Sequence, residues 1–208
     1  MTPDEILAGV AEEVNTCTKC DLHYSRKNGV AGEGPAHATI MFIGEGPGFH
    51  ENEQGRPFVG AAGRYLDELL EGVGMKREEV FIGNVVKCRP PGNRDPTPEE
   101  LNACSGYLDR QIQAINPKVI VTLGRFSMAK YFPNAKISQT HGQAMQVRGR
   151  LIVPMYHPAA ALHQPSLKPI VEKDFACLPK LIAQAADAPE YAEEILEENE
   201  EPKQLSMF

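Results

Sequence analysis

The chain has 208 residues, of which 42% are hydrophobic and 24% are charged, and its formal net charge is -7. This length suits one domain with a sizeable core, and no apolar run approaches the roughly 20 residues that a membrane-spanning helix requires. The N-terminal segment is acidic and amphipathic rather than a signal peptide, so we expect a cytoplasmic protein with no membrane association.

The negative charge is concentrated near the C-terminus. Eight of the 28 acidic residues, but only one base, Lys203, lie beyond residue 186. The rest of the chain is about neutral, and Lys87, Arg89 and Arg94 indicate a basic face on it. Charge alone does not identify the partner.

The hydrophobic pattern, taken along the chain, predicts strands that alternate with helices. Helices are predicted at 2–14, 61–73, 97–115, 124–131 and 167–186. Strands are predicted at 38–43, 80–86 and 119–123, followed by a β-hairpin at 143–155 whose second arm, 151–155, is a buried strand. This order predicts an α/β fold, a three-layer α/β/α arrangement around a central, mainly parallel four-stranded sheet.

Two helix starts carry capping signals. Thr2 with Glu5 three residues later is typical of a capping box, and Thr97 followed by Pro98 and Glu100 repeats the pattern.

Residues 44–60, GEGPGFHENEQGRPFVG, follow the first predicted strand. In open α/β sheets, ligands bind at such strand ends. Gly44, Gly46 and Gly48 let the backbone approach a ligand closely, and Glu45 places a carboxylate there. The segment has neither a Walker lysine nor a dinucleotide fingerprint, so a phosphate cradle is not expected.

Other polar and aromatic residues stand at neighbouring strand ends. Asn84 lies near the end of the second predicted strand, His157 follows the last, and Phe58 precedes a helix. Each of these residue types is more often structural than functional when it stands alone. Because parallel strands end at one edge of a sheet, we expect all three to converge with Glu45 on one site.

Four of the five cysteines, Cys17, Cys20, Cys88 and Cys104, form a second candidate site. Disulfides are not expected in a reducing compartment. Four thiolates at uneven spacing are compatible with zinc, with a 4Fe–4S cluster or with no metal, and the residues alone leave these open. Cys177 has no partner in the pattern, and we expect it to be a small buried apolar residue.

Together, GEGPG, Glu51, GRPFVGAAG, Asn84, MYHPAAAL and the four cysteines resemble the family 4 uracil-DNA glycosylases, the iron–sulfur members of that superfamily. The resemblance covers about residues 10–186. It implies the uracil-DNA glycosylase fold and a monofunctional enzyme that flips uracil out of single- or double-stranded DNA and leaves an abasic site. It also implies a structural 4Fe–4S cluster on Cys17, Cys20, Cys88 and Cys104.

The resemblance further implies roles for single residues. Phe58 would stack on the flipped uracil, Asn84 would read its O4 and N3 edge, and His157 would donate toward O2. Glu45 would orient the water or offset positive charge on the sugar, so the implied catalytic set is Glu45, Asn84 and His157. The backbone of Gly44 to Gly46 would line the pocket, and Glu51 would wall it near C5 of the base.

On the DNA side, the loop HPAAALHQP resembles the family's minor-groove loop. Leu162 would be the wedge that fills the gap left by the flipped nucleotide, and Arg89 and Arg94 would contact DNA. One relative carries a histidine in an inserted loop that traps uracil covalently. The corresponding segment here, RPPGNRDPTPEE, has no histidine, so turnover is expected.

Two alternatives to this function were considered. One is a non-catalytic iron–sulfur module that binds DNA or assists replication, and the presence of Glu45, Asn84 and His157 together argues against it. The other is a family 5-like glycosylase with broader substrates, whose first motif is not expected to carry a glutamate at position 45.

The C-terminal residues QLSMF resemble the pentapeptide with which bacterial repair proteins bind the sliding clamp. Gln204, Leu205, Met207 and Phe208 would bind the clamp from the end of a flexible tether. We therefore expect a glycosylase domain at 1–186, an acidic linker at 187–203 and a clamp-binding peptide at 204–208, in a monomer.

Overall fold

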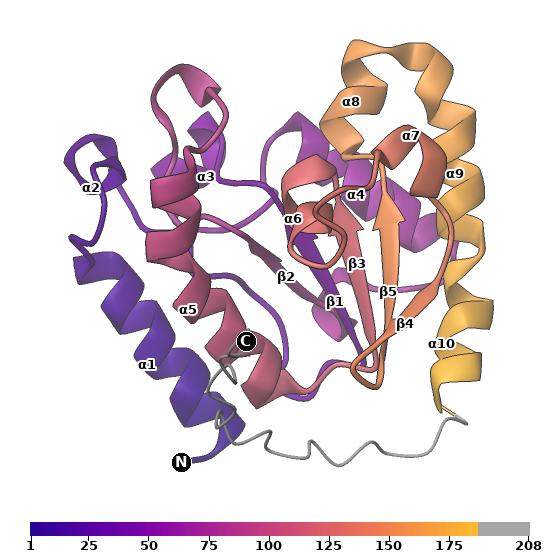
Figure 1. The fold of residues 1–208 in the computed structure, drawn as a ribbon, viewed down its shortest axis with the longest axis horizontal. Helices are drawn as coiled ribbons and strands as arrows, with labels where there is room; N and C mark the ends of the chain where they lie inside the picture. Colours follow the sequence, from indigo (N-terminus) through magenta and orange to yellow (C-terminus); the bar gives the residue numbers. More distant parts are fainter. Residues whose placement is uncertain (187–208) are drawn as a thin grey trace, which may run out of the picture.

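A five-stranded sheet in the order β2-β1-β3-β5-β4 forms the centre of the molecule in this computed structural model, which describes residues 1–186 (Figure 1). Its strands are Ile40–Gly44 (β1), Phe81–Asn84 (β2), Val119–Leu123 (β3), Met145–Val147 (β4) and Arg150–Met155 (β5). β1, β2, β3 and β5 are parallel, and β4 pairs antiparallel with β5. The mainly parallel α/β fold is confirmed. The sheet has one strand more than the predicted four because the first arm of the hairpin joins its edge.

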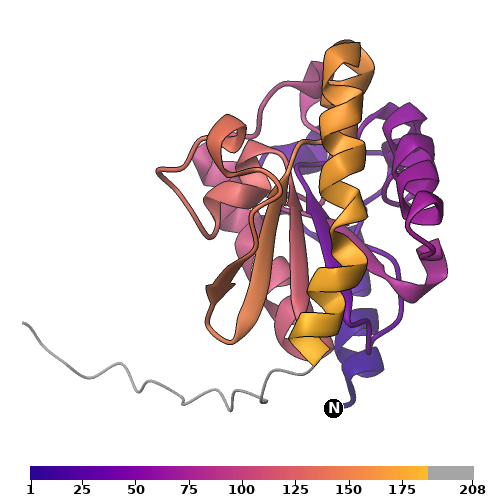
Figure 2. The ribbon, with the colours of Figure 1, turned by 90° about the vertical axis from the view of Figure 1, so that its right-hand side faces the viewer.

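Helices cover both faces of this sheet. They are Pro3–Thr16 (α1), Leu22–Ser25 (α2), Phe49–Gln54 (α3), Ala61–Gly72 (α4), Pro98–Ile115 (α5), Arg125–Ala129 (α6), Ile137–Thr140 (α7), Pro158–His163 (α8), Lys168–Ala176 (α9) and Leu178–Ala186 (α10). Short 3-10 turns lie at Arg77–Glu79, Pro91–Asn93 and Pro165–Leu167. α4 and α8 to α10 cover one face, α5 and α6 the other, and α1 packs outside α5 (Figures 1 and 2).

The two predicted capping boxes are confirmed. The side chain of Thr2 accepts from the Glu5 backbone and that of Thr97 from the Glu100 backbone, while each glutamate accepts from the threonine's own N–H. Such caps stabilise a helix by about 1 kcal/mol each. They fix the first residues of α1, which ends just before Cys17, and of α5, which contains Cys104.

The single helix predicted at 167–186 is wrong, since α9 and α10 are separated at Cys177. The physical reason is Pro179, which has no N–H to donate to the carbonyl of Phe175 and whose ring disfavours a continuous helix. The prediction also missed α2, α3, α7 and α8. The hairpin is confirmed, and its turn residues Arg148 and Gly149 both have positive φ.

The parallel strands bring the predicted site residues to one edge of the sheet. β1 ends at Gly44, directly opposite Asn84 at the end of β2. Pairing continues one step further, because the N–H groups of Val85 and Val86 donate to the carbonyls of Gly44 and Glu45. β5 ends at the same edge, two residues before His157.

Two predicted C-terminal regions lie beyond residue 186. The acidic linker at 187–203 and the clamp-binding peptide at 204–208 lie outside the described residues. Within residues 1–186, no helix combines the length and apolar character needed to cross a membrane.

Candidate active site

A cavity of about 380 Å³ opens at the carboxyl ends of β1, β2 and β5. Nearly all of the residues predicted to hold the base line this cavity. Those that line it are Glu45, Gly46, Glu51, Phe58, Asn84 and His157. Gly44 lies just behind this wall, where a Cβ would come within 2.5 Å of Asn84 Oδ1 and 2.7 Å of Phe58 Cζ. A glycine is therefore required there for the strand ends to approach one another.

Asn84 is the most deeply placed polar group of this cavity. Its side chain is only 1% exposed, and its Oδ1 has no hydrogen-bond partner among the described residues. Leaving a buried acceptor unpaired costs about 1–3 kcal/mol. An amide in that state is a site for a donor that the protein itself does not supply.

Phe58 is held in an uncommon backbone conformation beside Asn84. Its φ is 50°, and its carbonyl accepts from Arg77, which also pairs with Asp67 at 2.8 Å. Gly63 makes room for this turn, since a Cβ there would fall 1.9 Å from the Phe58 carbonyl oxygen. The backbone that presents the ring is thus fixed from two sides.

His157 packs its ring against that of Phe58, with the centroids 5.4 Å apart and the planes inclined by 25°. Its Nδ1 accepts from the N–H of Ala159 at 3.1 Å, which leaves Nε2 as the donor of the neutral ring. Burial lowers the pKa of His157 to about 4, more than the charge of Glu51 raises it. The ring is therefore a neutral hydrogen-bond donor at physiological pH.

Glu45 supplies a carboxylate at the end of β1. Burial raises its pKa above the ordinary value, and Asp95 raises it further while Arg125 opposes this. A half-buried carboxylate with a raised pKa in a cavity is a common feature of catalytic sites.

Glu51 ties the loop together from inside. Its carboxylate accepts from the N–H groups of Gly48 at 3.1 Å, Val59 at 2.9 Å and Gly60 at 2.9 Å. These bonds join the start of α3 to the start of α4. Glu51 lines the cavity, as predicted, and it also holds the backbone around it.

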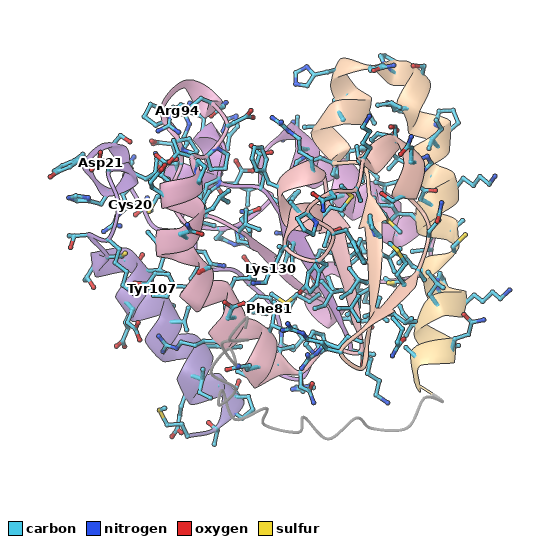
Figure 3. The ribbon with its side chains drawn as sticks, viewed as in Figure 1. Cys20, Asp21, Phe81, Arg94, Tyr107 and Lys130 are labelled. Carbon is cyan, nitrogen blue, oxygen red and sulfur yellow. The ribbon has the colours of Figure 1, made fainter. Side chains whose placement is uncertain are left out.

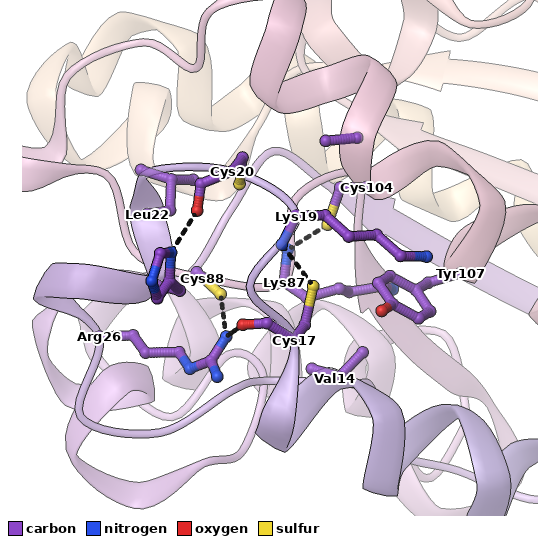
Figure 4. A pocket seen from close by; sticks show the side chains of 12 residues that line it. Val14, Cys17, Lys19, Cys20, Leu22, Arg26, Lys87, Cys88, Cys104 and Tyr107 are labelled. Carbon is purple, nitrogen blue, oxygen red and sulfur yellow. Dashed lines mark hydrogen bonds between the residues drawn. The ribbon is translucent and has the colours of Figure 1, made fainter.

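The four cysteines of the predicted cluster line a second cavity, between α1, α5 and the loop after β2 (Figure 4). Burial raises the pKa of Cys20, of Cys88 and of Cys104, the last to about 11. Within residues 1–186, no three His, Cys, Asp or Glu side chains are grouped to hold a single metal ion. The thiols instead surround a common space.

Three N–H groups donate to cysteine sulfurs of this cavity. The backbone of Lys87 donates to Cys104 Sγ at 3.2 Å, and Arg26 donates to Cys88 Sγ at 3.5 Å. The backbone of Lys19 donates to a third sulfur, that of Cys17, at 3.5 Å. Such donors stabilise a thiolate and the negative charge of any group that it binds.

Two predictions about single side chains are wrong. Lys87 does not belong to a basic face, because it is 1% exposed and its Nζ donates to Gln111 Oε1 at 2.7 Å. Its burial lowers its pKa to about 8. Cys177 is exposed rather than buried, because Val171, Phe175 and Leu178 take the face of α9 and α10 that packs on the core. Its thiol donates to the carbonyl of Lys173.

Comparison with known proteins identifies the family. Residues 31–185 match the model of the uracil DNA glycosylase superfamily. The chain belongs to this superfamily. A Type-4 uracil-DNA glycosylase of Sulfurisphaera tokodaii is 49% identical over 181 residues, 81% of each chain. One of Archaeoglobus fulgidus is 47% identical over 181 residues, 82% of this chain and 90% of its own. A Type-5 uracil-DNA glycosylase of Pyrobaculum aerophilum is 30% identical over 144 residues, 61% of this chain and 63% of its own.

In this member of the superfamily, the predicted DNA contacts lie on α8 and on the loop after β2. Leu162, on α8, is 38% exposed. Arg94, which is labelled in Figure 3, lines the cavity. Its guanidinium pairs with both carboxylate oxygens of Glu100. Arg89 lies over the ring of Phe49 and donates to Asn93.

Some residues that build the site carried no clear signal in the sequence. Arg77 reaches the Phe58 carbonyl across 19 positions, which no local pattern reveals. Gln111 accepts from Lys87 and donates to the Ala31 carbonyl, although it lies in the middle of an amphipathic helix. Glutamine is usually exposed, so the burial of Gln111 is evident only from the structure.

Glu51→Ala should lower the free energy of unfolding by about 1–3 kcal/mol, because three N–H groups of the loop lose their acceptor. Urea unfolding measures this change. Glu53→Ala is the matched control on the same helix: it removes only a surface pair with Lys27 and should cost less than about 1 kcal/mol. Equal losses in the two variants would contradict the structural role of Glu51.

Proposed function

We propose that this protein is a uracil-DNA glycosylase that flips uracil out of DNA, hydrolyses the bond between the base and deoxyribose, and releases free uracil from an abasic site. The observation that carries the proposal is the buried, unpartnered Oδ1 of Asn84, set in a cavity between Phe58 and His157. The kinship with Type-4 glycosylases supports the same activity.

Asn84 is the proposed reader of the base. Its Oδ1 accepts from N3–H of uracil and its Nδ2 donates to O4. Cytosine presents an acceptor at N3 and a donor at N4, so each of these bonds becomes a repulsion. A site that hydrogen-bonds a substrate edge in this way rejects the wrong edge strongly, because its own buried groups are left unpaired.

Phe58 and the glycine backbone position the flipped base. The aromatic ring offers a stacking surface, and the absence of Cβ atoms at Gly44 and Gly46 lets the backbone come close. Glu51 forms the wall that we assign to C5 of the base, where thymine carries a methyl group. One methyl against such a wall is worth about 1–3 kcal/mol of discrimination.

His157 stabilises the leaving group in this proposal. As the glycosidic bond breaks, the base gathers negative charge while the sugar becomes positive. The Nε2–H of the neutral ring donates toward O2 and stabilises that anion through this hydrogen bond. Its low pKa keeps it in this form.

Glu45 acts on the sugar side. As a carboxylate it offsets the positive charge on the sugar or orients the water whose oxygen bonds to C1′. No residue lining the cavity in the described part of the chain is a lysine. This lining is consistent with a reaction that hydrolyses the glycosidic bond and does not use an amine to cleave the DNA strand.

The DNA side of the proposal rests on Leu162 and Arg94, which are exposed, and on Arg89, which is partly buried. Leu162 enters the stack in place of the flipped nucleotide, and Arg89 and Arg94 contact phosphates. Uracil-containing DNA is therefore the proposed substrate. Binding of a sliding clamp by Gln204, Leu205, Met207 and Phe208 stays a separate proposal.

Cys17, Cys20, Cys88 and Cys104 would hold a 4Fe–4S cluster, a structural group that ties the N-terminal segment to the loop after β2. The fit is supported by four thiols around one cavity and by N–H donors to three of their sulfurs.

The activity is tested with an oligonucleotide that contains one uracil, beside the same strand with thymine or hypoxanthine, followed by alkali. Cleavage confined to the uracil strand is expected. Asn84→Ala and His157→Ala should each lower the single-turnover rate by about 100-fold or more. An intact uracil strand after incubation with cluster-loaded protein would overturn the proposal.

The pH dependence should separate Glu45 from His157. Glu45 is active as a carboxylate, so the rate falls as the pH drops through its raised pKa. As the pH falls, His157 stays neutral down to its pKa of about 4, so it contributes no change in rate above that pH. Single-turnover rates should show an acid limb in the wild type that disappears in Glu45→Gln. A limb that persists in Glu45→Gln would contradict this assignment.

Serine variants test the cluster. Wild-type protein purified without oxygen should contain about four iron atoms and four sulfides per chain. Replacing Cys17, Cys20, Cys88 or Cys104 should remove most of the iron and the visible absorption. Cys177→Ser, which changes an exposed thiol away from the cavity, should retain both. Stoichiometric zinc in place of iron would refute the cluster.

A further inference from the structure

Phe49 is an exposed aromatic residue at the mouth of the cavity. It begins α3 directly after Gly48, which lines the cavity, and 53% of its surface is exposed. Exposing a large apolar side chain is unfavourable compared with burying it. Its position beside the cavity indicates a contact that forms when DNA binds.

The ring of Phe49 is held in place by two neighbours. The guanidinium carbon of Arg89 lies 5.4 Å from the ring centroid, and the ring of His50 meets it edge-on at 5.5 Å. Arg89 is itself oriented by its bond from Nε to Asn93 Oδ1 at 2.8 Å. The pair is thus presented by two separate segments, α3 and the loop after β2.

The charge of Arg89 is available to a ligand. In residues 1–186 it forms no ion pair with a carboxylate, whereas Arg94, five positions later, is paired with Glu100. Arg89 also precedes Pro90, a residue of the cavity lining. An aromatic face and a free cation therefore stand together on the rim.

We propose that Phe49 and Arg89 form a nucleotide subsite that takes the neighbour of the flipped uridine, with its base stacked on Phe49 and its phosphate bound by Arg89. The inference rests on the proposed function and extends it beyond the base pocket. A strand whose uridine occupies the cavity has its next nucleotide at the rim. That nucleotide offers an aromatic face and a phosphate, the two groups that this pair binds.

The test uses three single-stranded oligonucleotides, each with one uracil. In the first, both neighbouring nucleotides are normal. In the other two, either the 5′ or the 3′ neighbour is replaced by an abasic tetrahydrofuran. Single-turnover reactions give the half-saturating concentration and the maximal rate. On the normal strand, Phe49→Ala should raise the half-saturating DNA concentration about tenfold and change the maximal rate less than about twofold. Phe49→Trp should restore binding.

The abasic strands distinguish stacking from a structural effect. On one of the two abasic strands, the wild type should bind as weakly as Phe49→Ala binds the normal strand. On that strand Phe49→Ala should weaken binding no further. Arg89→Gln should weaken binding to every strand and reduce its salt dependence, as loss of a phosphate contact does. Tyr24→Ala, at an exposed aromatic residue outside the cavity lining, is the matched control and should bind every strand like the wild type.

Wild-type binding by Phe49→Ala would overturn the subsite, and so would an equal loss on the normal strand and both abasic strands. A wild-type protein that releases no uracil from any strand would overturn the proposed function instead. The two failures are therefore distinguishable in one set of reactions.

Discussion

The register of two parallel strands is the constraint on which the site depends. Gly44 lies opposite Asn84, so the end of β1 packs against the side chain that ends β2. This pairing buries the amide and leaves its Oδ1 without a protein partner. An acceptor with no protein partner at the edge of a cavity favours a ligand that brings a donor to it.

Hydrogen bonds from several segments hold the loop around this amide. Glu51 accepts from three backbone N–H groups, and Arg77 holds the carbonyl of Phe58. The ring of His157 is fixed by its bond from Ala159 and by its contact with Phe58. Groups held in this way stabilise developing charge without having to reorganise. In the proposed reaction, the neutral donor of His157 and the carboxylate of Glu45 act on opposite ends of the breaking bond.

Much of this arrangement followed from the sequence because its signals are local. Alternating strands and helices predicted a parallel sheet, and parallel strands must end at one edge, which brought Glu45, Asn84 and His157 together. The burial of Lys87 and the bond from Arg77 could not be predicted, because both depend on contacts between distant segments. The helix break was predictable in principle from Pro179, but the apolar pattern on both sides concealed it.

The most direct test of the account is whether the cavity reads N3–H of the base. Single-turnover release should be measured for uracil and for N3-methyluracil in the same oligonucleotide, with the wild type and with Asn84→Ala. The account predicts that the wild type prefers uracil by about 100-fold or more and that the preference collapses in the variant, because the acceptor is gone. Equal release of the two bases by the wild type would contradict the central role of Asn84.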